Sequence, residues 1–215
     1  GGGDYYQPIT LTKGTYTIAM QWEDEFYSVS GIDGVATGSA NDFDIYLVTP
    51  AGDSLFGFNR NNLGGDPFEV MPFVVKATVD AKVIVTRKRG SGNIRFKYIL
   101  FRGEGSILNN TQGTGTVIAQ ANAAGAITVG AVLYTNTPAY GNTPTVASFS
   151  SRGGVNIKNE GDRQKPDITA PNGVNTTVAL GGVNIDNDPF PNFFGTSAAA
   201  PHAAGLAALL LDAKN

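Results

Sequence analysis

Residues 195–202 read Gly-Thr-Ser-Ala-Ala-Ala-Pro-His, and an apolar run continues from there to Leu211. Serine is a preferred residue at a helix start, because its side-chain oxygen accepts one of the backbone N–H groups left unbonded there. The following run is mostly Ala and Leu, which are strong helix formers, and Pro201 falls in the first turn, where proline is tolerated. We therefore expect a helix that begins near Ser197 and directs the positive end of its dipole at that serine.

A serine in this place has two interpretations. In most helices it is an ordinary N-cap, and a serine before an Ala-rich helix is by itself weak evidence of catalysis. The same place also suits a nucleophile, because a helix N-terminus stabilises the negative charge that develops during acyl transfer. The rest of the sequence has to decide between the two interpretations.

The composition of the 215 residues, with 41% hydrophobic residues, 15% charged residues and 28 glycines, is typical of a globular, turn-rich protein. The net charge of −3 argues against nucleic acid or an anionic membrane as a partner. The absence of Cys excludes disulfides and cysteine metal sites, and no apolar run is long enough to span a membrane. The chain begins Gly-Gly-Gly, without Met or signal-peptide character, so we expect a piece of a longer protein.

Residues 5–101 have the pattern of an all-β module. Short runs rich in β-branched and aromatic residues, such as 15–22 and 43–48, alternate with turns rich in Gly and Asn. Residues 94–101 alternate between basic and apolar side chains with the period of two that is typical of a half-buried strand. We predict an antiparallel sandwich or jelly-roll over residues 1–105.

The pattern changes near residues 103–106. Residues 126–132 read Ala-Ile-Thr-Val-Gly-Ala-Val, which is typical of a strand buried on both faces in a parallel sheet. A short strand that runs into a loop at 146–153, an extended segment between two prolines at 165–171 and the serine turn with its helix follow. We therefore predict an α/β segment over residues 106–215.

Four pieces in this order resemble the subtilases, the subtilisin-like serine peptidases. They are the strand at 126–132, Phe-Ser-Ser-Arg-Gly at 149–153, Lys-Pro-Asp-Ile-Thr-Ala-Pro at 165–171 and the serine motif at 195–202. The resemblance implies a secreted or cell-surface serine endopeptidase, with residues 106–215 forming the C-terminal part of its parallel-sheet catalytic domain. The alternative is a non-catalytic binding or inhibitory protein built from subtilase-like remnants.

The resemblance also implies roles for the serine motif. Ser197 is then the nucleophile that forms the acyl-enzyme, and its backbone N–H is one of the oxyanion donors. Gly195, Thr196 and Pro201 belong to the same motif and are expected to support the serine turn.

His202 and Asp167 are tempting as catalytic partners, but we interpret both, and also Arg152, as structural. His202 is the only histidine, and a step of five residues rotates about 140° around a helix, so it faces away from Ser197. In the resemblance, Asp167 ties its loop near the nucleophile, and Arg152 anchors backbone near the same cleft.

Several parts of a subtilase catalytic site are missing from this chain. It contains no Asp-Thr-Gly or Asp-Ser-Gly, no His-Gly-Thr and no Ala-Gly-Asn, the segments in which the family carries its catalytic Asp and His and its oxyanion Asn. Ala198 replaces a frequent Met, and Asn172 stands where the family often has Gly. Because a serine without a base is a weak nucleophile, we expect this polypeptide alone to be inactive. The β-module occupies the interval after the missing Asn, so we infer that it is inserted there.

The missing strands would leave a sheet edge and the apolar helix uncovered. The expected partners are therefore the N-terminal part of the catalytic domain or a second copy of this chain, besides a protein or peptide substrate. The serine mechanism requires no cofactor. Asp42 and Asp44, with Asp24 and Asp33 upstream, are candidate calcium ligands, and a solvated acidic turn is the alternative.

Overall fold

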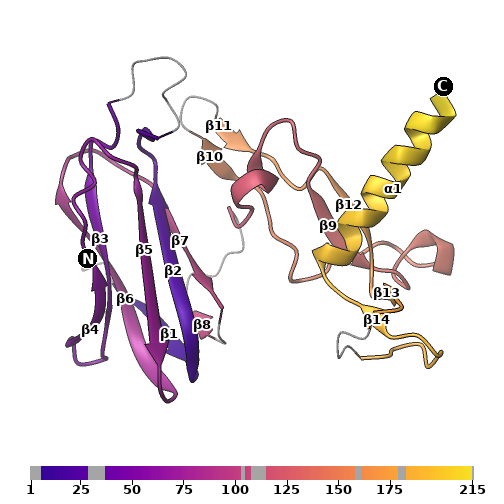
Figure 1. The fold of residues 1–215 in the computed structure, drawn as a ribbon, viewed down its shortest axis with the longest axis horizontal. Coiled ribbons are helices and arrows are strands. Elements are labelled where there is room, and N and C mark those ends of the chain that lie inside the picture. The colour runs from indigo at the N-terminus through magenta and orange to yellow at the C-terminus, as the bar shows by residue number, and fades with distance from the viewer. Residues whose placement is uncertain are drawn as a thin grey trace. The chain divides into compact units, whose positions relative to one another are not determined.

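The computed structural model describes residues 6–28, 37–102, 105–107, 115–157, 161–178 and 183–214. The chain divides into two compact units, Gly1–Gln112 and Gly113–Asn215 (Figure 1). This boundary lies a few residues beyond the one we predicted, because the strand at Gly105–Ile107 pairs with the strand at Gln7–Leu11 of the first unit. The mostly β character that we predicted for the first unit is present.

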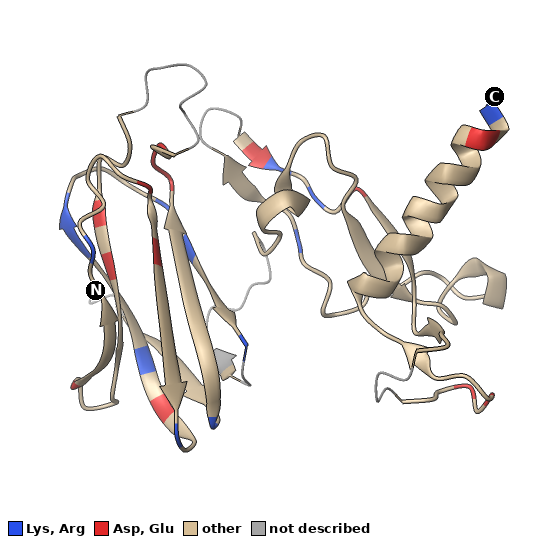
Figure 2. Cartoon of the chain, in the orientation of Figure 1, with Lys and Arg blue, Asp and Glu red and all other residues tan. Residues whose placement is uncertain are grey.

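The first unit contains two antiparallel sheets, one with the strand order β4-β3-β6-β1-β8 and one with the order β5-β2-β7. Their strands are β1 (Gln7–Leu11), β2 (Gly14–Trp22), β3 (Asp42–Val48), β4 (Ser54–Phe58), β5 (Phe68–Val75), β6 (Val79–Arg89), β7 (Phe96–Phe101) and β8 (Gly105–Ile107). Both basic and acidic residues occur along these strands (Figure 2).

Side chains from both sheets form one hydrophobic cluster. Along β2 the residues Tyr16, Ile18 and Met20 are buried while their neighbours are more exposed, as the period of two requires. They share the cluster with Ile45 of β3 and Phe73 of β5, and the Tyr16 and Phe73 rings stack with centroids 5.4 Å apart. The core of this unit is therefore built from large apolar and aromatic side chains.

The second unit holds one long helix and several short strands. They are β9 (Val129–Leu133), β10 (Val155–Ile157), β11 (Gly161–Arg163), β12 (Ile168–Asn172), β13 (Val174–Asn175), β14 (Asn192–Phe193) and α1 (Thr196–Lys214), with the 3-10 helices η2 (Ala119–Asn122) and η3 (Pro138–Tyr140). β9 and β12 pair in parallel, whereas β10–β11 and β13–β14 are antiparallel pairs. The parallel sheet that we predicted is thus a single pair among the described residues.

Helix α1 packs its first turns against β9 and β12 through alanines. Ala131 of β9, Ala170 of β12 and Ala199 of α1 form a small buried cluster, because the absence of long side chains allows close approach. The other edge of β9 is occupied by the segment that includes Ala147 and Ser150. The Ala147 N–H donates to Ala131 O at 2.8 Å, and Ser150 Oγ accepts the Ala131 N–H at 2.9 Å.

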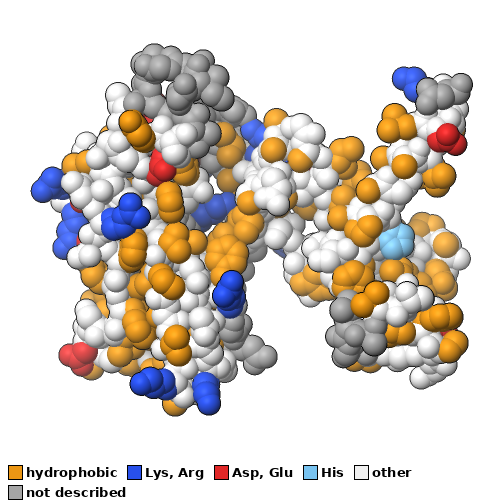
Figure 3. Space-filling view, viewed as in Figure 1, with side chains coloured by type: hydrophobic (Ala, Val, Ile, Leu, Met, Phe, Trp, Pro, Cys, Tyr) orange, Lys and Arg blue, Asp and Glu red, His pale blue; other side chains and the backbone are white. Residues whose placement is uncertain are grey.

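The C-terminal half of α1 is apolar and exposed. Leu206, Leu209, Leu210 and Leu211 are 57–69% exposed, and Figure 3 shows hydrophobic side chains along the helix. Among the described residues, no helix combines the length and apolar character needed to cross a membrane.

Candidate active site

Ser197 is the second residue of α1 and is exposed. Gly195 precedes the helix with φ of 109°, a conformation that residues with a Cβ rarely adopt. Its carbonyl accepts the N–H groups of Ala198 at 3.0 Å and Ala199 at 3.3 Å. The helix thus begins at Thr196, one residue before the N-cap that we predicted, and Gly195 closes its first turn.

The start of α1 provides favourable electrostatics for acyl transfer at Ser197. Backbone N–H groups at a helix start are not all paired within the helix, and the dipole is positive at this end. An oxyanion formed next to Ser197 would therefore be stabilised by the helix. The structure places the serine where such chemistry is favoured.

The turn before Ser197 is connected to the end of β12. The Gly195 N–H donates to Asn172 Oδ1 at 3.4 Å, and the Gly173 N–H donates to Phe193 O at 2.9 Å. Asn192 is buried, and its Nδ2 donates to Gly173 O at 3.0 Å. In the sequence Asn172 was notable solely as a departure from the family pattern, and nothing drew attention to Asn192.

His202 is bound to its own helix. Its Nδ1 lies 2.7 Å from Ala198 O, one helical turn earlier, and its side chain is at the surface (Figure 3). With Pro201, Val174 and Phe193 it lines a pocket of about 260 Å³ whose lining does not include Ser197. These contacts are those of a structural residue.

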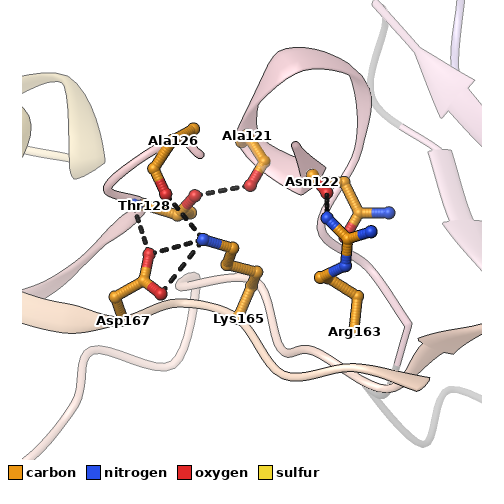
Figure 4. Close-up of polar contacts among 7 residues, drawn as sticks. All are labelled: Ala121, Asn122, Ala126, Thr128, Arg163, Lys165 and Asp167. Carbon is orange, nitrogen blue, oxygen red and sulfur yellow. Dashed lines mark hydrogen bonds and ion pairs between the residues drawn. The ribbon is translucent and has the colours of Figure 1, made fainter. Parts of the chain in front are cut away.

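Asp167 forms an ion pair with Lys165, two residues earlier, and hydrogen bonds from this pair join it to a second segment (Figure 4). The buried Lys165 Nζ lies 2.8 Å from Asp167 Oδ2 and 3.0 Å from Oδ1, and it donates to Ala126 O at 2.6 Å. The Thr128 N–H donates to Asp167 Oδ2 at 2.7 Å. The hydrogen bond from Lys165, followed by that from Thr128, lowers the pKa of Asp167. Asp167 therefore connects its loop to the chain just before β9.

Arg152 makes its described hydrogen bonds through the backbone. Its N–H donates to Thr116 Oγ1 at 2.8 Å, and its carbonyl accepts the Thr116 N–H at 2.9 Å. Its side chain is exposed and lines, with Lys165 and Asp167, a pocket of about 620 Å³ that does not include Ser197. The main chain of Arg152 is thus bound to Thr116, and the anchoring role of its side chain stays a prediction.

Asp42 and Asp44 are buried on β3 and are bound by donors of the protein. Asp42 Oδ1 accepts the Asn62 N–H at 3.1 Å, and Asp44 Oδ2 accepts the Tyr46 hydroxyl at 2.9 Å, with Lys88 Nζ at 3.8 Å. The alternative of a solvated acidic turn is therefore wrong, because both carboxylates are removed from water.

The other two candidate calcium ligands are Asp24 and Asp33. Asp24 Oδ2 accepts hydrogen bonds from Ser39 and Asn41, and Asp33 lies outside the described residues. Within the described part of the chain, no three His, Cys, Asp or Glu side chains gather to hold a metal ion. One carboxylate oxygen of each of Asp24, Asp42 and Asp44 accepts donors of the protein, and calcium binding at these residues stays a prediction.

Comparison with known proteins decides the family. The model of the subtilase family matches residues 77–215, which include the serine motif. The chain belongs to the subtilase family. This confirms the resemblance seen in the sequence.

The relatives of this subtilase chain are longer than the chain itself. Subtilisin-like protease SBT1.6 of Arabidopsis thaliana is 44% identical over an alignment of 78 residues, and the match covers 33% of this chain and 10% of that protein. The structure of the Clostridium perfringens CspB protease aligns with a TM-score of 0.52 and 17% identity over 98% of this chain and 44% of that one. The latter likeness concerns the fold alone. The chain spans less than half the length of either relative.

Proposed function

We propose that this chain is part of a serine endopeptidase that hydrolyses peptide bonds through an acyl-enzyme on Ser197. The observation that carries the proposal is an exposed serine at the start of α1, presented by a glycine with φ of 109°, in a chain of the subtilase family. A non-catalytic binding protein has no specific observation in its favour.

In the proposed reaction Ser197 Oγ attacks the carbonyl carbon of the scissile peptide bond, and the carbonyl oxygen becomes negatively charged. The Ser197 N–H and the α1 dipole stabilise this oxyanion. The hydroxyl proton must pass to a base, which then protonates the leaving amine. His202 is hydrogen-bonded to Ala198 O of its own helix. The base and its acidic partner therefore come from the N-terminal part of the catalytic domain.

A serine-directed fluorophosphonate probe tests the proposal. The complete protease should be labelled at Ser197 and lose labelling in the Ser197→Ala variant, whereas the isolated 215-residue chain should remain unlabelled. Ser151→Ala is the matched control, because Ser151 is exposed in the same unit. Absence of labelling in the complete protease would overturn the peptidase proposal, and stoichiometric labelling of the isolated chain would overturn its predicted inactivity.

We also propose that residues 106–215 form the C-terminal part of the catalytic domain and that residues 1–105 are an inserted β-sandwich. The alignment of nearly the whole chain with one protease chain supports this arrangement. The family relationship supports a protein or peptide substrate and a secreted or cell-surface location.

The exposed leucines of α1 support a further partner in the same proposal. The N-terminal part of the catalytic domain would cover this apolar surface, and in its absence two copies of the chain would associate. Light scattering at micromolar concentration should then detect a dimer of the isolated chain. A monomer under these conditions would contradict the homodimer.

A further inference from the structure

We propose that Asn172 is a positioning residue for Ser197, acting through the turn at Gly195. The inference rests on the proposed function of Ser197. Asn172 is the last residue of β12 and is 1% exposed. Its side-chain oxygen accepts the Gly195 N–H, and Ser197 follows two residues later.

The side chain of Asn172 extends a series of backbone hydrogen bonds. The residues after β12 pair with those before α1 through β13 and β14, and the Gly173 N–H continues the series by donating to Phe193 O. The main-chain carbonyl of Asn172 accepts the Tyr134 N–H at 2.9 Å. The side-chain oxygen of Asn172, and not its main-chain carbonyl, accepts the Gly195 N–H.

The corner that carries Asn172 has little room to move. Gly173 has φ of 73°, and a Cβ on it would lie 2.7 Å from Leu133 Cδ1 and 3.0 Å from Phe194 Cε1. The main chain of Asn172 is also paired with β9. Asn172 Oδ1 is thus presented to Gly195 from a tightly packed position.

The amide nitrogen of Asn172 strengthens the inference. Nδ2 is buried and has no hydrogen-bond partner among the described residues. A buried donor without a partner is unfavourable, so an apolar or smaller residue would suit a purely structural position better. The contact of Oδ1 with Gly195 is what distinguishes asparagine here.

Both the N–H and the carbonyl of Gly195 are hydrogen-bonded. Asn172 accepts the Gly195 N–H, and the Gly195 carbonyl accepts the N–H groups of Ala198 and Ala199. Loss of the Asn172 oxygen would let this turn rotate and would move Ser197 relative to the bound peptide. Small displacements of a reacting group slow the chemical step more than they weaken substrate binding.

Steady-state kinetics of the complete protease tests the proposal. Asn172→Leu, which is similar in volume but has no acceptor, should lower kcat about tenfold and leave KM within about twofold. Asn172→Asp keeps an acceptor oxygen in place and should retain most of the wild-type kcat. Asn156→Leu is the control, because it removes an amide bonded to Asp162 within the β10–β11 pair. An unchanged kcat in Asn172→Leu would overturn the proposal.

Amide hydrogen exchange of the 215-residue chain gives an independent readout. The Gly195 N–H should exchange faster in Asn172→Leu than in the wild type or Asn156→Leu, while the Ala131 N–H reports whether the β9 region is intact. If Asn172→Leu does not fold, Asn172→Gly, which removes the same oxygen without adding bulk, decides the question in both experiments. Unchanged exchange at Gly195 would count against the role of Asn172.

The two proposals fail in distinguishable ways. If Ser197→Ala leaves the complete protease active, the proposed function is wrong. If Ser197→Ala abolishes activity while the Asn172 variants keep wild-type kcat and wild-type exchange at Gly195, the positioning role alone is wrong.

Discussion

Glu69 is a fully buried acid on β5, where it pairs in register with Met20 of β2. Neither of its carboxylate oxygens has a hydrogen-bond partner of good geometry among the described residues, and a backbone contact with Arg60 has only a small effect on its pKa. Burial raises the pKa of Glu69 to about 7, the charge of Arg60 opposes the increase, and the charges of Asp44 and Asp42 add to it. The folded first unit therefore binds a proton at Glu69 under mildly acidic conditions.

This proton makes the stability of the first unit depend on pH. The unfolded chain releases it near the ordinary glutamate pKa of about 4.3, and the folded chain near 7. Between these values the folded state binds more protons, so stability should fall as pH rises and level off above about pH 7. Glu69→Gln should remove this dependence and raise the free energy of unfolding near pH 8 by on the order of 3 kcal/mol.

Urea unfolding followed by the fluorescence of Trp22, the only tryptophan, measures this effect at about pH 5 and about pH 8. Asp53→Asn is the control, because Asp53 is exposed. Equal stability of the wild-type chain at both pH values would contradict the prediction.

Lys165 controls the ionisation of Asp167 in the second unit. Its hydrogen bond is the largest cause of the low pKa of Asp167, so Lys165→Met should raise that pKa towards its ordinary value. The wild-type pair contributes stability above the unfolded pKa of about 3.9, and this is lost as pH falls through the lower folded pKa. Carboxyl-carbon NMR titration of Asp167 measures the change. Lys214→Met, at the exposed end of α1, should leave Asp167 unaffected.

At the scale of the element, one glycine just before α1 and one within it provide a matched test of backbone conformation. Gly195→Ala should destabilise the second unit by about 1–2 kcal/mol, because the alanine must adopt a positive φ. A Cβ at Gly195 would meet nothing closer than 3.7 Å, so strain and not a clash is the cause. Gly205→Ala, with nothing within 4 Å of its Cβ, should instead stabilise the helix by about 1 kcal/mol.

Thermal unfolding followed by circular dichroism measures both alanine variants. Opposite changes in the melting temperature support the assignment of strain to Gly195. If both variants shift the melting temperature in the same direction, the positive φ of Gly195 is not the reason for its glycine.

At the scale of the whole molecule, the two units have very different cores. The first has a cluster of large side chains that includes Tyr16, Ile18 and Phe73, whereas the buried cluster of the second consists of three alanines. Because hydrophobic stabilisation follows the apolar area removed from water, the first unit should be the more stable one.

The chain should therefore unfold in two transitions. Helical circular dichroism should report the loss of α1 at lower urea concentration than Trp22 fluorescence reports the loss of the first unit. Ile18→Ala should lower the stability of the later transition by about 2–5 kcal/mol and leave the earlier one in place. Coincident transitions by both probes would contradict the independence of the units.

Local patterns in the chain were sufficient to predict β2, β3, the helix after the serine motif and the family. Alternation along a strand and the spacing of a motif are properties of neighbouring residues, so they are visible before folding. The family motifs also directed attention to Ser197 and to the loop that contains Asp167. The start of the parallel strand was predicted three residues early, at 126, whereas β9 begins at Val129.

Tertiary structure alone decided the environment of the charged and amide side chains. Asp42 is buried with a donor from Asn62, 20 positions along the chain, and Asp44 faces Lys88 of β6. Glu69 is enclosed by the core of the first unit, and Asn172 contacts Gly195 across 23 positions of sequence. Such contacts join segments that are distant along the chain, so neither composition nor periodicity contains them. The sequence motifs were sufficient to predict Ser197 as the candidate nucleophile and the family, because they are local. The residues that contact the turn before Ser197 were visible only in the folded structure, because they come from distant segments.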